Sequence, residues 1–153
     1  MTTTYYTPKV EEFHIGFEFE VHINTGFRPT DHFKEGEEWT KTTWDYFDCM
    51  DTATVDPNDY RVKHLDRYDA ESLGWEHDYN LEPIPNRETD PTFEGYSIED
   101  GNKIFMLYLF NDGEVWIELV IGNAGHGFIF KGKLQNKSEL RRLMIQLGII
   151  DNK

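Results

Sequence analysis

Residues 13–23 alternate between apolar and polar side chains without interruption. The stretch reads F-H-I-G-F-E-F-E-V-H-I. A period of two over this length is typical of a β-strand that buries one face. The buried face would hold the apolar residues Phe13, Ile15, Phe17, Phe19, Val21 and Ile23. The opposite face would hold His14, Gly16, Glu18, Glu20 and His22, and it is either a solvated surface or a binding site.

Three further strands are expected in the last third of the chain. Residues 104–110 are apolar on both faces, which favours a central strand covered on both sides. The sequence Asn-Asp-Gly at 111–113 has good hairpin chemistry and leads into an alternating strand at 114–121. A third strand, at 128–134, follows a glycine-rich turn. Its alternation predicts one face with Ile129, Lys131 and Lys133, and another with Phe128, Phe130 and Leu134.

Two helices are expected, one in the middle of the chain and one near its end. Asp66 can cap a short helix that ends near Gly74, with Trp75 packing back where the helix stops. Asn136 caps the second helix, and Glu139 follows three residues later as in a capping box. The second helix has an apolar stripe at helical spacing, formed by Leu140, Leu143, Met144 and Leu147.

Shorter strands are expected at 38–47 and 60–65, whereas residues 76–103 suggest a long loop or irregular edge strands. The pattern as a whole predicts an α+β fold in one domain, residues 1–153. Its antiparallel β-sheet would have about five to seven strands, with the short middle helix and with the C-terminal helix packed on the sheet. That helix stripe, or the curvature of the sheet, would seal the apolar face of residues 13–23.

The charge of the chain is strongly negative and unevenly distributed. The net charge is −14, with 29 acidic against 15 basic side chains. Residues 1–100 have a net charge of −16, whereas residues 101–153 have a net charge of +2. This distribution disfavours direct binding to DNA or to an anionic membrane, and it permits binding to a host protein with a basic surface or to cations.

Cys49 is the single cysteine, so the chain cannot form an internal disulfide. No apolar stretch is long enough to cross a membrane, and the N-terminal residues lack an apolar signal region. We therefore expect a protein of the cytoplasm, in a reducing environment.

Three phrases together resemble a group of uncharacterised small proteins from phages and mobile elements of Bacteroidota. They are Y-T-P-K-V-E-E-F-H-I-G-F-E-F-E at 6–20, R-V-K-H-L-D-R-Y-D-A-E-S-L-G-W at 61–75 and G-K-L-Q-N-K-S-E-L-R-R-L-M-I-Q-L-G-I at 132–149. The resemblance implies a phage accessory protein made inside a bacterial host cell. It implies no activity, because the group has no established biochemistry.

The polar face of the first strand is the first candidate site. His14, Glu18, Glu20 and His22 have side chains of the types that bind divalent metals. However, neighbours on one face of a strand lie about 7 Å apart, so a single strand cannot bring four ligands to one ion. We therefore predict no metal and no cofactor, and a solvated or hydrogen-bonded face remains the simpler interpretation.

Further candidates lie near the C-terminus. His126 sits among glycines, where backbone N–H groups could bind an anion, although the spacing of a phosphate-binding loop is absent. A basic group could meet a phosphate, and it comprises Lys131, Lys133, Lys137, Arg141 and Arg142. A flexible hairpin loop would also explain the glycine-rich segment around His126, and an ordinary solvated surface would also explain the basic group.

The sequence therefore predicts a phage-type accessory protein that acts by binding and is not an enzyme. The first hypothesis is an acidic inhibitor of a host protein, which could imitate the charge of DNA. The alternative is a protein that binds a nucleotide or another small ligand, with aromatic side chains for stacking and the C-terminal cations, Lys131 and Arg141 among them, for phosphate. His126 is a further candidate ligand-binding residue. A metal-dependent hydrolase that uses the polar face of the first strand comes third. The sequence leaves a homo-oligomer open.

Overall fold

The computed structural model describes residues 3–9, 12, 17–22, 38–43, 60–81 and 92–151. The chain divides into two compact units, Met1–His64 and Leu65–Lys153. Each unit has its own sheet and its own hydrophobic cluster. The expectation of one domain over residues 1–153 stays a prediction.

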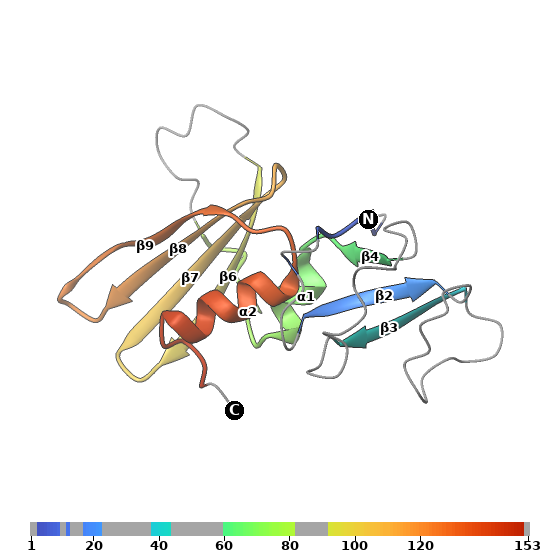
Figure 1. The fold of residues 1–153 in the computed structure, drawn as a ribbon. Coiled ribbons are helices and arrows are strands. Elements are labelled where there is room, and N and C mark those ends of the chain that lie inside the picture. Colours follow the sequence, from blue (N-terminus) through green and yellow to red (C-terminus); the bar gives the residue numbers. More distant parts are fainter. Residues whose placement is uncertain are drawn as a thin grey trace. The chain divides into compact units, whose positions relative to one another are not determined.

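The first unit contains a four-stranded antiparallel sheet. Its strands are β1 (Tyr5–Tyr6), β2 (Glu18–His22), β3 (Trp39–Thr43) and β4 (Tyr60–Lys63). They lie in the order β1-β4-β2-β3, so β2 is hydrogen-bonded to β4 on one side and to β3 on the other (Figure 1). The strands expected at 38–47 and 60–65 thus form at 39–43 and 60–63, and residues 44–47 lie outside the described residues.

The alternation in residues 17–22 produces the predicted two-faced strand. Phe17, Phe19 and Val21 are buried, and with Tyr60 and Val62 of β4 they form the hydrophobic cluster of this unit. Glu18, Glu20 and His22 alternate with them and are partly exposed. The rest of the predicted strand, residues 13–16 and 23, lies outside the described residues.

The second unit contains a five-stranded antiparallel sheet and two helices. The strands are β5 (Glu76–His77), β6 (Phe93–Asp100), β7 (Lys103–Phe110), β8 (Glu114–Ile121) and β9 (Gly125–Lys133), in sequential order across the sheet. The helices are α1 (Arg67–Ser72) and α2 (Lys137–Gln146). The hairpin between β7 and β8 turns at Gly113, whose φ of 79° is a conformation that glycine adopts without strain.

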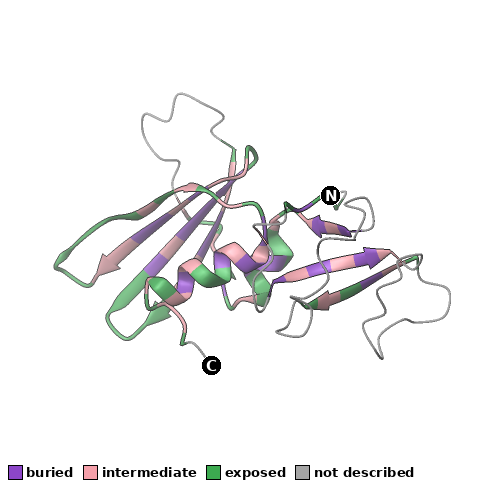
Figure 2. Cartoon of the chain, in the orientation of Figure 1, coloured by how far each residue is buried: buried purple, intermediate pink, exposed green. Residues whose placement is uncertain are grey.

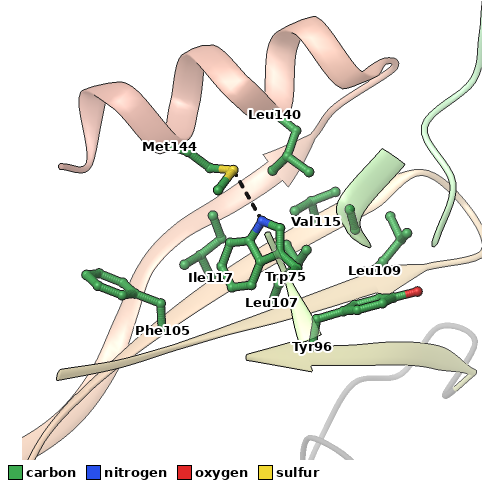
Figure 3. Packing of buried hydrophobic residues seen from close by; sticks show 10 residues of the cluster. Trp75, Tyr96, Phe105, Leu107, Leu109, Val115, Ile117, Leu140 and Met144 are labelled. Atoms are coloured by element: carbon green, nitrogen blue, oxygen red, sulfur yellow. Dashed lines mark hydrogen bonds between the residues drawn. The ribbon is translucent and has the colours of Figure 1, made fainter. Parts of the chain in front are cut away.

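The core of this unit lies between α2 and one face of the sheet. Alternate residues of β7 and β8 point to α2, among them Leu107 and Ile117 (Figure 3). From α2, Leu140 and Met144 are fully buried and Leu143 and Leu147 are partly buried, as the stripe predicted. Trp75 lies beneath the helix, where its indole Nε1–H donates to the Met144 sulfur over 3.2 Å.

Both helices begin at the residues that the sequence indicates. The Asp66 side chain accepts from the Asp69 N–H, and the Asp69 side chain accepts from the Asp66 N–H, which completes a capping box. The Asn136 side chain accepts from the Glu139 N–H over 3.0 Å. The Glu139 carboxylate instead accepts from the N–H of Gln135, one residue before the cap.

Two features differ from the prediction. The strands of the described residues divide into sheets of four and five strands, whereas the sequence predicted one sheet of about five to seven. The stripe of α2 packs on the sheet of its own unit. Within 76–103, where a loop or irregular strands were expected, β6 is a regular strand that pairs with β7 over all eight residues. Gly95 and Ser97 weaken its apolar alternation, which explains why the pattern was not recognised.

No helix in the described parts of the chain is long and apolar enough to span a membrane.

Candidate functional site

The polar face of β2 is occupied by contacts with the neighbouring strands. Glu18 forms an ion pair of 2.9 Å with Lys41 of β3. Glu20 accepts a hydrogen bond of 2.6 Å from Nε of Arg61, which lies directly opposite on β4. The His22 ring lies edge-on to Trp39, with 4.9 Å between the ring centroids.

Arg61 links several of these side chains. Its guanidinium carbon lies 3.9 Å from the centroid of the Tyr5 ring and 4.3 Å from that of Trp39. Stacking on two aromatic rings while binding a carboxylate uses both the planar face and the N–H edge of the group. The polar face of β2 therefore joins the four strands of the first unit to one another.

The predicted metal-type residues are not brought together as a metal site in the part of the structure that is described. Among the described residues, no group of three or more His, Cys, Asp or Glu side chains could hold a metal ion. His14 lies outside the described residues, as does Cys49.

A second group of polar side chains lies on the sheet of the second unit. The face opposite α2 carries Phe93, Tyr108, Phe110, Trp116 and Phe128, and we call it the aromatic face. Consecutive rings along it lie 5.2–6.0 Å apart between centroids, within the range of favourable aromatic contacts.

A hydrogen-bonded cluster of Tyr108, Glu118 and His126, which we call the Glu118 cluster, lies on this aromatic face. The Tyr108 hydroxyl donates to Oε2 of Glu118 over 3.0 Å. Nδ1 of His126 lies 2.5 Å from Oε1 of the same carboxylate, so a proton on Nδ1 is donated to it. The side chain of Glu118 is 8% exposed and that of His126 is 72% exposed. The cluster thus connects a buried carboxylate to the surface through an imidazole.

The environment of Tyr108 favours its neutral form. Burial raises the pKa of the Tyr108 hydroxyl well above its usual range, and the hydrogen bond to Glu118 and the negative charge of that carboxylate raise it further. The phenol therefore stays a hydrogen-bond donor to Glu118 at physiological pH.

Lys131 lies on the same face as the Glu118 cluster. Its Nζ lies 4.1 Å from the centroid of the Trp116 ring and 4.3 Å from that of Phe128. The prediction that Phe128 and Lys131 point to opposite faces is wrong. Ile117 pairs with Phe130 and Glu118 pairs with Phe128, so Ile129 is an extra residue in β9. This β-bulge shifts the alternation by one and turns Phe128 to the side of Lys131.

The structure brings together only part of the phosphate site predicted from the sequence. His126 and Lys131 share the aromatic face of β9. Arg141 is an exposed residue of α2, the helix that covers the opposite face of the sheet. The three residues therefore do not converge on one ligand.

Sequence reasoning missed Tyr108 and Glu118. Glu118 is the single charged residue within V-W-I-E-L-V-I at 115–121, and a charge inside an apolar strand is a recognisable signal. Tyr108 gave no such signal, since tyrosine fits an apolar strand on either face.

The comparisons with known proteins give one similarity. No family model matches the chain, and no solved structure matches it. The chain is 30% identical over 94 residues to the major tail protein Gp23 of Mycobacterium phage D29. The matched stretch covers 61% of this chain and 44% of the phage protein, so the chain spans less than half of that relative. The similarity supports a phage origin, and the Bacteroidota source stays a prediction.

Proposed function

We propose that this chain is a structural subunit of a phage particle, belonging to the tail, that acts by binding other protein subunits. The observation that carries the proposal is the 30% identity over 94 residues to a phage major tail protein. Because the match covers 44% of that protein, the assembly role is our inference for this chain.

The architecture of the second unit suits a protein that must resist mechanical force. Four long strands, β6 to β9, pair antiparallel over most of their lengths. One face of their sheet packs against α2, and the other is covered by contacting aromatic rings. A sheet with apolar packing on both faces is rigid, which suits a particle component.

The polar side chains described above support a binding role in preference to catalysis. Glu18 and Glu20 are held by Lys41 and Arg61, and Glu118 is held by Tyr108 and His126. Each of these carboxylates contacts a neighbouring strand of its own sheet, and so contributes to cohesion of that sheet.

Electron microscopy of the purified full-length protein tests this proposal. A structural subunit should form rings, tubes or other repeating assemblies as its concentration rises, and averaged images should show copies in a regular arrangement. Uniform single particles the size of one chain at every concentration would contradict the proposal.

A second candidate function is favoured by the charge distribution. Residues 1–100 have a net charge of −16, which suits an inhibitor that binds the basic surface of a host protein. Such an inhibitor should retain one defined protein from a bacterial lysate, and binding should weaken as salt increases. The matched control is the same affinity matrix with a neutral protein of similar size. Retention of the same proteins by both would remove this candidate.

A further inference from the structure

The outer strand of the second sheet has a long open edge. β9 is the last strand of the five-stranded sheet and has nine residues, so it spans ~30 Å (Figure 1). It pairs with β8 on one side, and no strand among the described residues pairs with its other side. Seven of its nine residues are exposed, which Figure 2 shows as a largely green strand. The backbone N–H and C=O groups along such an edge can pair with an added strand.

One face of β9 carries a row of side chains that an added strand would meet. The row pairs with alternate residues of β8 and consists of His126, Phe128, Lys131 and Lys133. The bulge at Ile129 brings the two halves of the row to the same face of the sheet. Phe128 is 38% exposed, and Nζ of Lys131 lies over the rings of Trp116 and Phe128. The Lys131 ammonium is therefore held beside the edge before any partner arrives.

The edge is basic on an acidic protein. β9 contains Lys131 and Lys133 and no acidic residue, whereas the whole chain has a net charge of −14. Lysines on an edge strand oppose pairing with a second copy of the same strand, because like charges would face one another. An acidic strand would instead place its carboxylates beside the lysines. Charge complementarity therefore favours an acidic strand over a second β9.

Gly127 is an independent sign that another chain approaches this edge. Its φ does not lie in the left-handed region, and a Cβ at this position would meet no heavy atom of the described residues within 4 Å. Neither its backbone conformation nor its packing among the described residues therefore requires glycine, although glycine weakens a strand. A glycine inside a strand can mark the place where another backbone comes close.

We propose that the edge of β9 binds an extended acidic segment of another protein, which pairs with it as an additional strand. The carboxylates of the segment would lie beside Lys131 and Lys133. Its apolar residues would alternate with the carboxylates and lie on the opposite face, the face of Gly127. The inference goes beyond the proposed function, because it holds whether or not the chain assembles with its own copies.

Binding of a synthetic peptide to the full-length protein tests the inference. The probe is a blocked nine-residue peptide in which Glu and Val alternate, matched in length to β9. One control peptide has Lys in place of each Glu, and the other has Pro in place of each Val, which keeps the charge but cannot form a ladder. The Glu/Val peptide should bind with a Kd below ~1 mM by fluorescence anisotropy. Each control should bind on the order of tenfold more weakly.

Neutralising the lysines of β9 tests their part in binding. We would compare Lys131→Gln/Lys133→Gln with Arg141→Gln/Arg142→Gln, which makes the same change in net charge on exposed residues of α2. The β9 variant should raise the Kd of the Glu/Val peptide on the order of fivefold relative to the α2 variant. The single variant Lys133→Gln guards against loss of folding, because it leaves Lys131 on its two rings. It should weaken binding in the same direction while the near-ultraviolet circular dichroism stays that of the wild type.

Hydrogen–deuterium exchange identifies the occupant of the edge. Exchange of residues 125–133 should slow when the Glu/Val peptide binds. Protection of these residues that rises with protein concentration without peptide would assign the edge to a second copy of the chain and overturn the inference.

Three other results would also overturn the inference. They are no binding of the Glu/Val peptide at ~1 mM, equal binding of the Glu/Val and Pro-containing peptides, and equal weakening in the β9 and α2 variants. Each of the three would leave the proposal of a tail subunit standing, because electron microscopy tests that proposal separately.

Discussion

Glu118 is the residue whose surroundings are most unusual. Its carboxylate is buried in an apolar strand, and it is retained there by the Tyr108 hydroxyl and the His126 imidazole. A buried carboxylate that loses a donor keeps its desolvation cost without compensation. The cluster should therefore be sensitive to small chemical changes at each of its three members.

The first prediction concerns the Tyr108 hydroxyl. Tyr108→Phe should lower the free energy of unfolding by about 1–3 kcal/mol, because Glu118 loses a donor while staying buried. Tyr79→Phe is the matched control, since Tyr79 is 87% exposed and its change should be below about 0.5 kcal/mol. Urea denaturation measures both. Equal effects of the two substitutions would mean that the Tyr108–Glu118 bond does not stabilise the fold.

The second prediction concerns alkaline pH. Burial, followed by hydrogen bonds to Glu118 and Glu94, raises the pKa of Tyr108 and of Tyr96 above the usual value. In the unfolded chain these phenols lose their protons near pH ~10, whereas in the folded protein they keep them. The stability they contribute is therefore present below that pH and is lost as pH rises further.

Unfolding measured in urea at a series of pH values above neutrality checks the pH prediction. The free energy of unfolding should fall above about pH 10. The decrease in the free energy of unfolding per pH unit should be smaller in Tyr108→Phe, and smaller again when Tyr96→Phe is added. A slope that is the same in the double variant and the wild type would contradict this assignment.

At the scale of single elements, the caps and the bulge decide the local structure. The start of α2 was readable from the sequence, because Asn136 and the stripe at Leu140 and Met144 follow rules that depend on nearby residues. The alternation of Phe17, Phe19 and Val21 was readable for the same reason. The bulge at Ile129 could not be predicted from the sequence, because a bulge depends on the partner strand β8 and has no signal in β9 itself. The face of Phe128 was mistaken as a result.

The third prediction concerns the cap of α2. Asn136 is 2% exposed and accepts from the Glu139 N–H. Asn136→Ala should destabilise the protein by about 1 kcal/mol, whereas Asn136→Asp keeps an acceptor and should cost less. Thermal and urea unfolding measure the difference. If Asn136→Asp destabilises the protein as much as Asn136→Ala does, the hydrogen-bond acceptor at this position is not what stabilises the helix.

The fourth prediction concerns the packing of α2 on its sheet. Met144→Ala should cost about 2–5 kcal/mol, since it opens a cavity beside Trp75. Met144→Leu nearly conserves the volume and removes the sulfur acceptor, so it should cost less than about 1.5 kcal/mol. Unfolding followed by tryptophan fluorescence checks both values. A larger effect for Leu than for Ala would contradict this description of the core.

At the scale of the whole molecule, the division into two sheets was the part that the sequence could not predict. The strand signals of residues 17–22 and 104–121 are similar in kind, and pairing between distant strands leaves no local mark. The α+β class and the antiparallel arrangement followed from the strand and helix patterns, whereas the assignment of strands to sheets did not. The Glu118 cluster was missed for a different reason: its members come from three consecutive strands, and the charge of Glu118 within an apolar strand was a signal that the prediction did not use.

The fifth prediction follows from the separate clusters of the two units. Residues 65–153 contain all of the five-stranded sheet, α2 and the cluster around Trp75. This segment expressed alone should fold and should show one cooperative urea transition. Trp75 and Trp116 report its tertiary structure by fluorescence. A gradual, non-cooperative transition would mean that the second unit needs the first in order to fold.

The composition of purified phage particles tests the proposed structural role most directly. Quantitative mass spectrometry would be applied to particles produced from a genome that encodes this chain. The proposed role predicts that the chain is present in many copies per particle and stays with the particles through purification. Absence of the chain from the particles, with the protein found only in the lysate, would contradict it.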